Sequence, residues 1–149
     1  MSNEIRRVDF YVLAAADGDA RLRFACRLAE KVYALGQRVH LHAASAAESA
    51  ELDELLWTFR QGSFLPHEML RADLPPQSPV TVGHGDVATH RTEVLINLAA
   101  EVPDFVEAFP RVAEIVDGNE DDRQLGRERF RRYRGAGWIT ATHPIGASP

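Results

Sequence analysis

Residues 8–43 read VDFYVLAAADGDARLRFACRLAEKVYALGQRVHLHA, and the pattern of this segment indicates the fold class of the chain. It begins with a short apolar run over 8–14 that is typical of a strand. Residues 20–35 carry apolar side chains at helical spacing, and Gly36 predicts the end of that helix. A second strand is predicted over 38–43. The order strand, helix, strand indicates an α/β domain.

The rest of the chain continues this alternation of strands and helices. Further elements are predicted in this order: a helix opened by the capping box Ser45-Ala46-Ala47-Glu48 and running to about Phe59, a Gly- and Pro-rich loop over 60–79, short strands over 80–83 and 93–98, a short helix from Pro103, a strand over 111–117 and a helix over 119–136. We therefore expect one domain over 1–149, with three layers, a mostly parallel sheet and helices on both faces. Short connections between 80 and 98 allow an antiparallel strand there, which would make the sheet mixed.

This Rossmann-like arrangement raises the question of nucleotide binding, because phosphate loops follow the first strand of such folds. Here the loop over 14–20 reads AAADGDA, with one glycine and two aspartates. It contains neither G-x-G-x-x-G nor G-x-x-x-x-G-K-[ST], and its carboxylates would repel phosphate. We expect a Rossmann-like fold without a nucleotide site.

Histidines are the remaining candidates for metal binding or catalysis. His40 and His42 share one face of a predicted strand. A Gly-containing loop holds three further candidates, His84, Asp86 and His90. No zinc motif accompanies these residues in the sequence, and no nucleophile elbow G-x-S-x-G occurs. We interpret them as surface or edge side chains, and we expect no catalytic residue, no metal, no cofactor and no small-molecule substrate.

The composition is typical of a globular protein of 149 residues, of which 45% are hydrophobic and 26% charged. No apolar run approaches the ~20 residues that span a bilayer. Residues 1–7 lack the apolar run of a signal peptide. We therefore expect a cytoplasmic protein without membrane contact. Cys26 is the single cysteine, which excludes an internal disulfide.

An arginine-rich helix near the C-terminus is the clearest functional signal, because the chain as a whole is acidic, with a formal net charge of -5. Its arginines are Arg123, Arg127, Arg129, Arg131, Arg132 and Arg134. At about 100° per residue, one stripe of the helix holds Arg123, Arg127, Phe130 and Arg134. Such a local concentration of positive charge points to a specific anionic partner.

The opposite side of this helix is expected to be buried. Leu125, Tyr133 and Ala136 fall on that side by helical spacing. Arg129 points the same way, and we expect it to pair with a carboxylate or to extend its guanidinium to solvent. Phe130 then lies at the margin of the core, beside a column of guanidinium groups.

Three interpretations of the stripe remain open from spacing alone. Guanidinium groups beside an aromatic suit an acidic peptide with a hydrophobic end. The same combination also suits single-stranded nucleic acid. Alternatively, the arginines are solvated and pair with acids of the helix itself, namely Glu120, Asp121 and Glu128.

A second candidate surface covers 57–66. Trp57 lies off the apolar face of the helix predicted before it, and Phe64 and Leu65 follow in a loop. Exposed apolar clusters of this kind mark protein interfaces. The alternative is that the loop folds back and that Trp57 packs beneath another helix.

Several segments together resemble one family, the chi subunit of the bacterial DNA polymerase III holoenzyme. They are VDFYVL, LDELLW, SFLPHE, EVLINL and, most specifically, RQLGRERFRRYRGAGW. The resemblance runs from the first strand to the arginine-rich helix. It implies a non-catalytic accessory protein of the clamp-loader assembly with a nucleotide-binding type of fold that is not used for catalysis.

The resemblance also implies two partners. One is the acidic C-terminal tail of single-stranded DNA-binding protein (SSB), and the other is the psi subunit, which would link the chain to the clamp loader, so that DNA is contacted only indirectly. The tail-binding site of the family maps onto Val116, Arg123, Arg127 and Phe130, and the arginine stripe adds Arg134. The psi-binding surface maps onto Trp57, Phe64 and Leu65.

The chain departs from the family pattern at some positions. Phe130 stands where tyrosine is frequent, so a hydroxyl contact to the tail would be missing, and Arg123 stands where lysine also occurs. The rival function is direct binding of single-stranded nucleic acid by the arginine-rich helix. A net charge of -5 disfavours strong binding of this kind.

Overall fold

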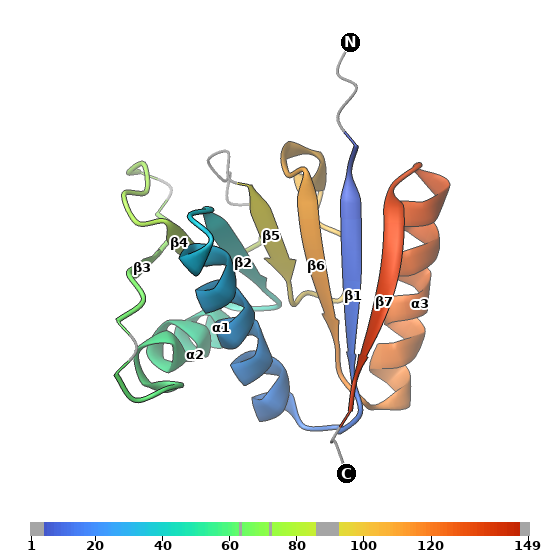
Figure 1. The fold of residues 1–149 in the computed structure, drawn as a ribbon, viewed down its shortest axis with the longest axis horizontal. Helices are drawn as coiled ribbons and strands as arrows, with labels where there is room; N and C mark the ends of the chain where they lie inside the picture. Colours follow the sequence, from blue (N-terminus) through green and yellow to red (C-terminus); the bar gives the residue numbers. More distant parts are fainter. Residues whose placement is uncertain (1–4, 63, 72, 86–92, 147–149) are drawn as a thin grey trace.

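The computed structural model describes residues 5–62, 64–71, 73–85 and 93–146, and it is an α/β domain built around one seven-stranded sheet (Figure 1). The elements in chain order are β1 (Arg7–Leu13), α1 (Gly18–Ala34), β2 (Val39–Ala43), α2 (Ala46–Thr58), β3 (His67–Met69), β4 (Val80–His84), β5 (Val94–Asn97), the short 3-10 helix η1 (Val106–Ala108), β6 (Arg111–Val116), α3 (Glu120–Gly135) and β7 (Ile139–Ile145). Among the described residues, no helix is both long and apolar enough to cross a membrane.

The strands are ordered β3-β4-β2-β5-β6-β1-β7, and every neighbouring pair is parallel. The expectation of an antiparallel strand between 80 and 98 is wrong. β4 and β5 do not pair with each other, because β2 lies between them and pairs in parallel with both. The three-layer α/β class is confirmed, since α1 and α2 pack on one face of the sheet and α3 packs on the other.

Local sequence signals explain where the helices on the first face begin. Asp17 caps α1, because its carboxylate accepts a hydrogen bond from the backbone N–H of Asp19. Ser45 caps α2 by accepting from the N–H of Glu48, whose own carboxylate accepts from the N–H of Ala44. The start of α2 agrees with the predicted capping box, whereas α1 begins at Gly18, two residues before the predicted start.

Strand β2 lies in the middle of the sheet and is buried along its whole length. The interpretation of His40 and His42 as surface or edge residues is therefore wrong, because they are only 1% and 7% exposed. His40 bonds to Thr81 at 2.8 Å, and burial lowers its pKa to about 3. His84 bonds to Ser49, whereas Asp86 and His90 lie outside the described residues. Within the described ranges, no three potential ligands form a group that could hold a metal ion.

Two strands were not predicted. β3 lies inside the region expected to be a loop, and β7 follows the arginine-rich helix. β7 is an edge strand that pairs with β1 from Arg7 and Ile139 to Leu13 and Ile145. Consequently β1 lies between β6 and β7, and one face of these three strands is available to α3.

The loops that follow β1 and β6 touch each other. The N–H of Gly118 donates to the carbonyl of Ala15 at 3.1 Å, and the carboxylate of Asp117 accepts from the N–H of Asp17 at 3.0 Å. A Cβ atom at position 118 would lie 2.6 Å from the carbonyl oxygen of Ala14. Only glycine therefore fits where the two loops cross.

Candidate peptide-binding groove

A groove of about 580 Å³ lies between α3 and the strands β1, β6 and β7. Its lining residues are Phe10, Val12, Ala14, Val116, Arg123, Gly126, Arg127, Phe130, Thr142, Pro144, Ile145 and Gly146. The groove lies at the carboxyl ends of the three strands, because Ala14, Val116 and Ile145 are at or next to their last residues. Parallel α/β sheets bind ligands at this end as a general rule.

The floor of the groove is apolar. Phe10 and Val116 are buried, with 2% and 3% exposure, and Phe130 is half-buried above them. The rings of Phe10 and Phe130 are 5.4 Å apart and tilted. Gly126 allows α3 to approach the sheet closely, since a Cβ there would lie 3.0 Å from a methyl group of Val116. The floor of the groove is therefore a preformed apolar surface that could contact an aromatic or aliphatic side chain of a ligand.

Two guanidinium groups border this apolar floor. Arg123 donates to the backbone carbonyl of Leu13 at 3.5 Å, and its buried Nε has no hydrogen-bond partner among the described residues. Arg127 is half-exposed and pairs with Glu120 at 2.6 Å and with Gln124 at 3.0 Å. A buried donor without a partner is costly, so an acceptor from a ligand would improve the site at Arg123.

The structure brings together four of the five residues predicted for tail binding: Val116, Arg123, Arg127 and Phe130 all line the groove. Arg134 does not line it and is exposed near the last turn of α3. The sequence prediction missed the lining residues that β1 and β7 supply, which are Phe10, Val12, Thr142, Pro144 and Ile145. The apolar run over 8–14 was a usable signal for the first two, whereas β7 itself was not predicted.

The expected buried side of α3 is only partly correct. Tyr133 is 2% exposed, but Leu125 is 38% exposed and Ala136 is exposed as well. Leu125 lies in the first half of α3. In that half the helix contacts the sheet through Gly126, which packs against Val116 of β6, and not through Leu125. A helix with so few apolar side chains is held by polar contacts in addition to its narrow apolar side.

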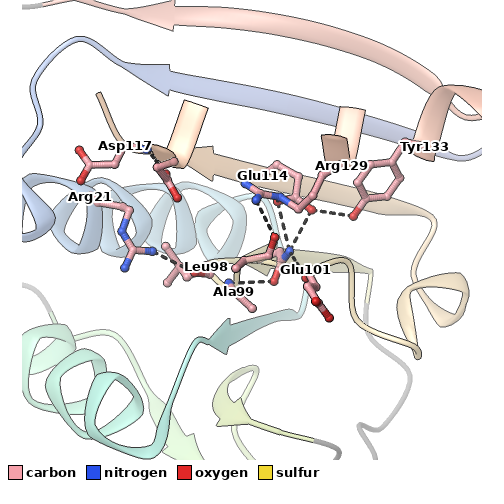
Figure 2. Close-up of polar contacts among 11 residues, drawn as sticks. Arg21, Leu98, Ala99, Glu101, Glu114, Asp117, Arg129 and Tyr133 are labelled. Carbon is pink, nitrogen blue, oxygen red and sulfur yellow. Dashed lines mark hydrogen bonds and ion pairs between the residues drawn. The ribbon is translucent and has the colours of Figure 1, made fainter. Parts of the chain in front are cut away.

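Those polar contacts form a buried network under α3 (Figure 2). Arg129 donates to Glu114 at 2.8 Å, Tyr133 donates to the other carboxylate oxygen at 2.7 Å, and Asn97 donates to both oxygens. Arg129 also donates to the carbonyl of Ala100. Of the two alternatives expected for Arg129, the structure shows pairing with a carboxylate and not an extension to solvent. Burial raises the pKa of the Glu114 carboxyl, and its three donors oppose that rise.

The second candidate surface is partly apolar and exposed. Trp57 is 55% exposed, with its ring 4.3 Å from that of His67, and Phe64 is 88% exposed. Leu65, in contrast, is 2% exposed and belongs to the core on the side of α1 and α2. A pocket of about 400 Å³ lies beside Phe64, between the end of α1 and the loop after α2. Trp57 and Phe64 thus remain available to a partner, and Leu65 supports the loop from below.

Comparison with known proteins gives one consistent family. A family model described as "DNA polymerase III chi subunit, HolC" matches residues 5–140. The chain is 45% identical over 139 residues to a protein of Pseudomonas aeruginosa described as DNA polymerase III subunit chi, an alignment that covers 93% of this chain and 96% of that protein. It is 30% identical over 139 residues to the protein of the same description from Escherichia coli, covering 90% of this chain and 95% of the relative. The protein so described from Haemophilus influenzae is 28% identical over 142 residues, which cover 95% of this chain and 99% of the relative.

Proposed function

This chain belongs to the DNA polymerase III chi subunit family, and from this membership we propose that it is a non-catalytic accessory subunit that connects two partners. One partner is the acidic C-terminal tail of SSB, bound in the groove under α3. The other is the psi subunit, bound at the surface of Trp57 and Phe64. In this role the protein links SSB-coated DNA to the clamp loader.

The observation that carries the tail-binding proposal is an apolar groove bordered by two guanidinium groups. Val116 and Phe130, together with Phe10, would contact the terminal aromatic side chain of the tail. Arg123 and Arg127 would bind the C-terminal carboxylate and the nearby aspartates. Arg127 would exchange its contact with Glu120 for one with the ligand, because that pair is exposed and contributes little to stability.

Replacing Arg127 with alanine tests this proposal. We expect the affinity for an acidic tail peptide to fall by about tenfold or more, because a charge-assisted hydrogen bond contributes roughly 1.5–3 kcal/mol. Isothermal titration calorimetry at low and high salt measures the loss, and wild-type binding should weaken as salt screens the charges.

Arg131→Ala is the matched control, since Arg131 is exposed on the same helix but does not line the groove. Equal affinity of the Arg127→Ala variant and the wild type would refute the assignment of the groove. If a single-stranded oligonucleotide displaces the peptide with the same dependence on Arg127, the rival function of the arginine-rich helix gains support instead.

The psi-binding proposal makes a separate prediction for Phe64. Truncation of this exposed ring to alanine should weaken association with a psi subunit by about 1–2 kcal/mol, because aromatic anchors contribute strongly to interfaces. Surface plasmon resonance with immobilised psi measures the change. Leu74→Ala is the control, because Leu74 is also exposed, at 53%, but lies outside the Phe64 pocket. Unchanged association, or an equal loss in both variants, would count against this surface.

A further inference from the structure

On the side of the sheet opposite α3, most of β1 and all of β7 lie beyond the described helices. α1 packs over β2, β5 and β6, so β1 and β7 are open toward the viewer in Figure 1. Parallel sheets are normally covered on both faces. This open sheet face, defined by Arg7, Asp9, Tyr11, Arg111 and His143, is therefore a second candidate binding surface, separate from the groove under α3.

Positive charge collects on the open sheet face. Arg7 and Arg111 lie side by side in the register of β1 and β6, and the next residue on that side of β1 is Asp9, which is 5% exposed. Arg7 bonds to Asp9 at 2.9 Å, His143 bonds to it at 2.8 Å, and Arg111 approaches it at 3.6 Å. Two guanidinium groups and one imidazole thus share one carboxylate, and the two arginines alone leave an excess of positive charge at this place on a protein whose net charge is -5.

A small cleft opens beside these cations. It has a volume of about 140 Å³ and lies between the second half of α1 and strands β1 and β6. Leu28, Val32 and Tyr11 supply apolar walls. The charged residues of the cleft are Lys31, Arg111 and Asp9, whose carboxylate is already paired with the arginines. Lys31 is exposed and has no ion-pair partner within the described part of the chain.

An aromatic row continues from α1 to the edge of the sheet. The ring of Phe24 is 5.3 Å from that of Tyr11, which stacks on His143 at 5.0 Å. Aromatic side chains beside cationic ones are a common way for proteins to hold single-stranded nucleic acid, because bases stack on rings while phosphates contact cations.

We propose that the open sheet face binds the backbone of single-stranded nucleic acid, with phosphates at Lys31, Arg7 and Arg111 and an unpaired base at the cleft. The cleft favours a single strand over a duplex, since only an unpaired base can leave the stack and enter an apolar recess. It also favours nucleic acid over an acidic peptide, whose carboxylates would meet the cations but leave the recess empty. This site is separate from the groove and does not depend on SSB-tail binding.

The test measures fluorescence anisotropy of a labelled oligothymidylate with the full chain over a series of salt concentrations. The double variant Lys31→Gln/Arg111→Gln should bind the oligonucleotide roughly tenfold more weakly at low salt. The slope of the logarithm of the binding constant against the logarithm of the salt concentration should become shallower by about 1.4, which is about 0.7 for each lost phosphate contact. The control Arg23→Gln/Arg71→Gln removes the same charge from exposed arginines elsewhere and should bind like the wild type.

Thermal unfolding verifies that both double variants are folded. Equal weakening by the two double variants would overturn the proposal, because it would show dependence on net charge alone. Loss of binding in Arg127→Ala but not in Lys31→Gln/Arg111→Gln would show that the oligonucleotide binds at α3, and this result would also overturn the proposal. Equal affinity for a duplex of the same length, or binding of a poly-glutamate peptide in place of the oligonucleotide, would reject the single-stranded ligand.

Discussion

Arg129→Met is expected to lower the free energy of unfolding by about 3–5 kcal/mol, because it leaves a buried carboxylate without its cationic partner. Glu114 is fully buried, and Arg129 is 4% exposed. Figure 2 shows the contact between their side chains. Urea unfolding, followed by the fluorescence of the buried Trp138, measures this loss. The exposed Arg132 on the same helix provides the control, and Arg132→Met should change stability by less than about 0.5 kcal/mol.

A second variant separates the charge from the shape of this network. Glu114→Gln in the Arg129→Met background removes the unpaired charge while retaining polar atoms for Asn97 and Tyr133. We expect it to restore a substantial part of the lost stability, since removing both charges is far less costly than removing one. A loss in Arg129→Met no larger than that in Arg132→Met would show that the ion pair is not what holds α3 on the sheet.

The loss in Arg129→Met should also depend on pH. Burial already raises the pKa of Glu114, and the lost attraction to Arg129 raises it further. Between the unfolded pKa and this raised folded pKa, the folded state holds a proton that the unfolded state releases, so stability falls as pH rises. The destabilisation should therefore be smaller at about pH 5 than at about pH 8. Urea unfolding at both values would reveal a pH-independent loss, which would contradict this account.

Gly118→Ala is expected to destabilise the domain by about 2–3 kcal/mol, because the added methyl group meets backbone atoms that cannot move independently. Its Cβ would lie 2.6 Å from atoms of Ala14 and Ala15, at the crossing of the loops after β1 and β6. Because Ala14 also lines the groove, binding of the tail peptide should weaken in the same variant. Thermal unfolding and calorimetry measure the two effects.

Gly135→Ala is the matched control, since nothing lies within 4 Å of a Cβ at that position in the last turn of α3. The same chemical change should there stabilise the protein by roughly 0.5–1 kcal/mol, because alanine is the better helix former. Opposite signs in the two variants would confirm that the close approach, and not the backbone freedom of glycine, explains Gly118. Equal stability of Gly118→Ala and the wild type would mean that the loops can separate without cost.

The sequence was sufficient for elements whose signals are local. The cap at Ser45 and the helical spacing of the arginines each depend on neighbours within a turn. The polar side chain of Arg129 could likewise be placed on the inner side of α3, because that depends only on the helical period. Its partner Glu114 could not be identified, since β6 and α3 meet through the tertiary fold.

Features that depend on distant pairing could not be predicted. β7 contains Pro144 and alternating polar residues, and it is a strand because β1 offers it an edge. His40 and His42 look like surface residues until β2 is placed between β4 and β5 in the sheet. Leu65 lies next to the exposed Phe64 in sequence, yet it points into the core. In each case the environment is determined by strand order, which periodicity does not encode.

The position of β1 between β6 and β7 has a consequence for how the protein is made. During synthesis β1 cannot pair until much later, because both of its neighbours in the sheet are translated after it. Arg7, for example, pairs with Arg111 on one side and with Ile139 on the other. Such long-range pairings slow folding and leave strand edges unprotected in the nascent chain. The groove needs β1, β6, α3 and β7 at once. A ribosome-bound fragment that ends before β7 would therefore have the arginines but no complete groove, so the binding proposed for the groove requires that β7 has been translated.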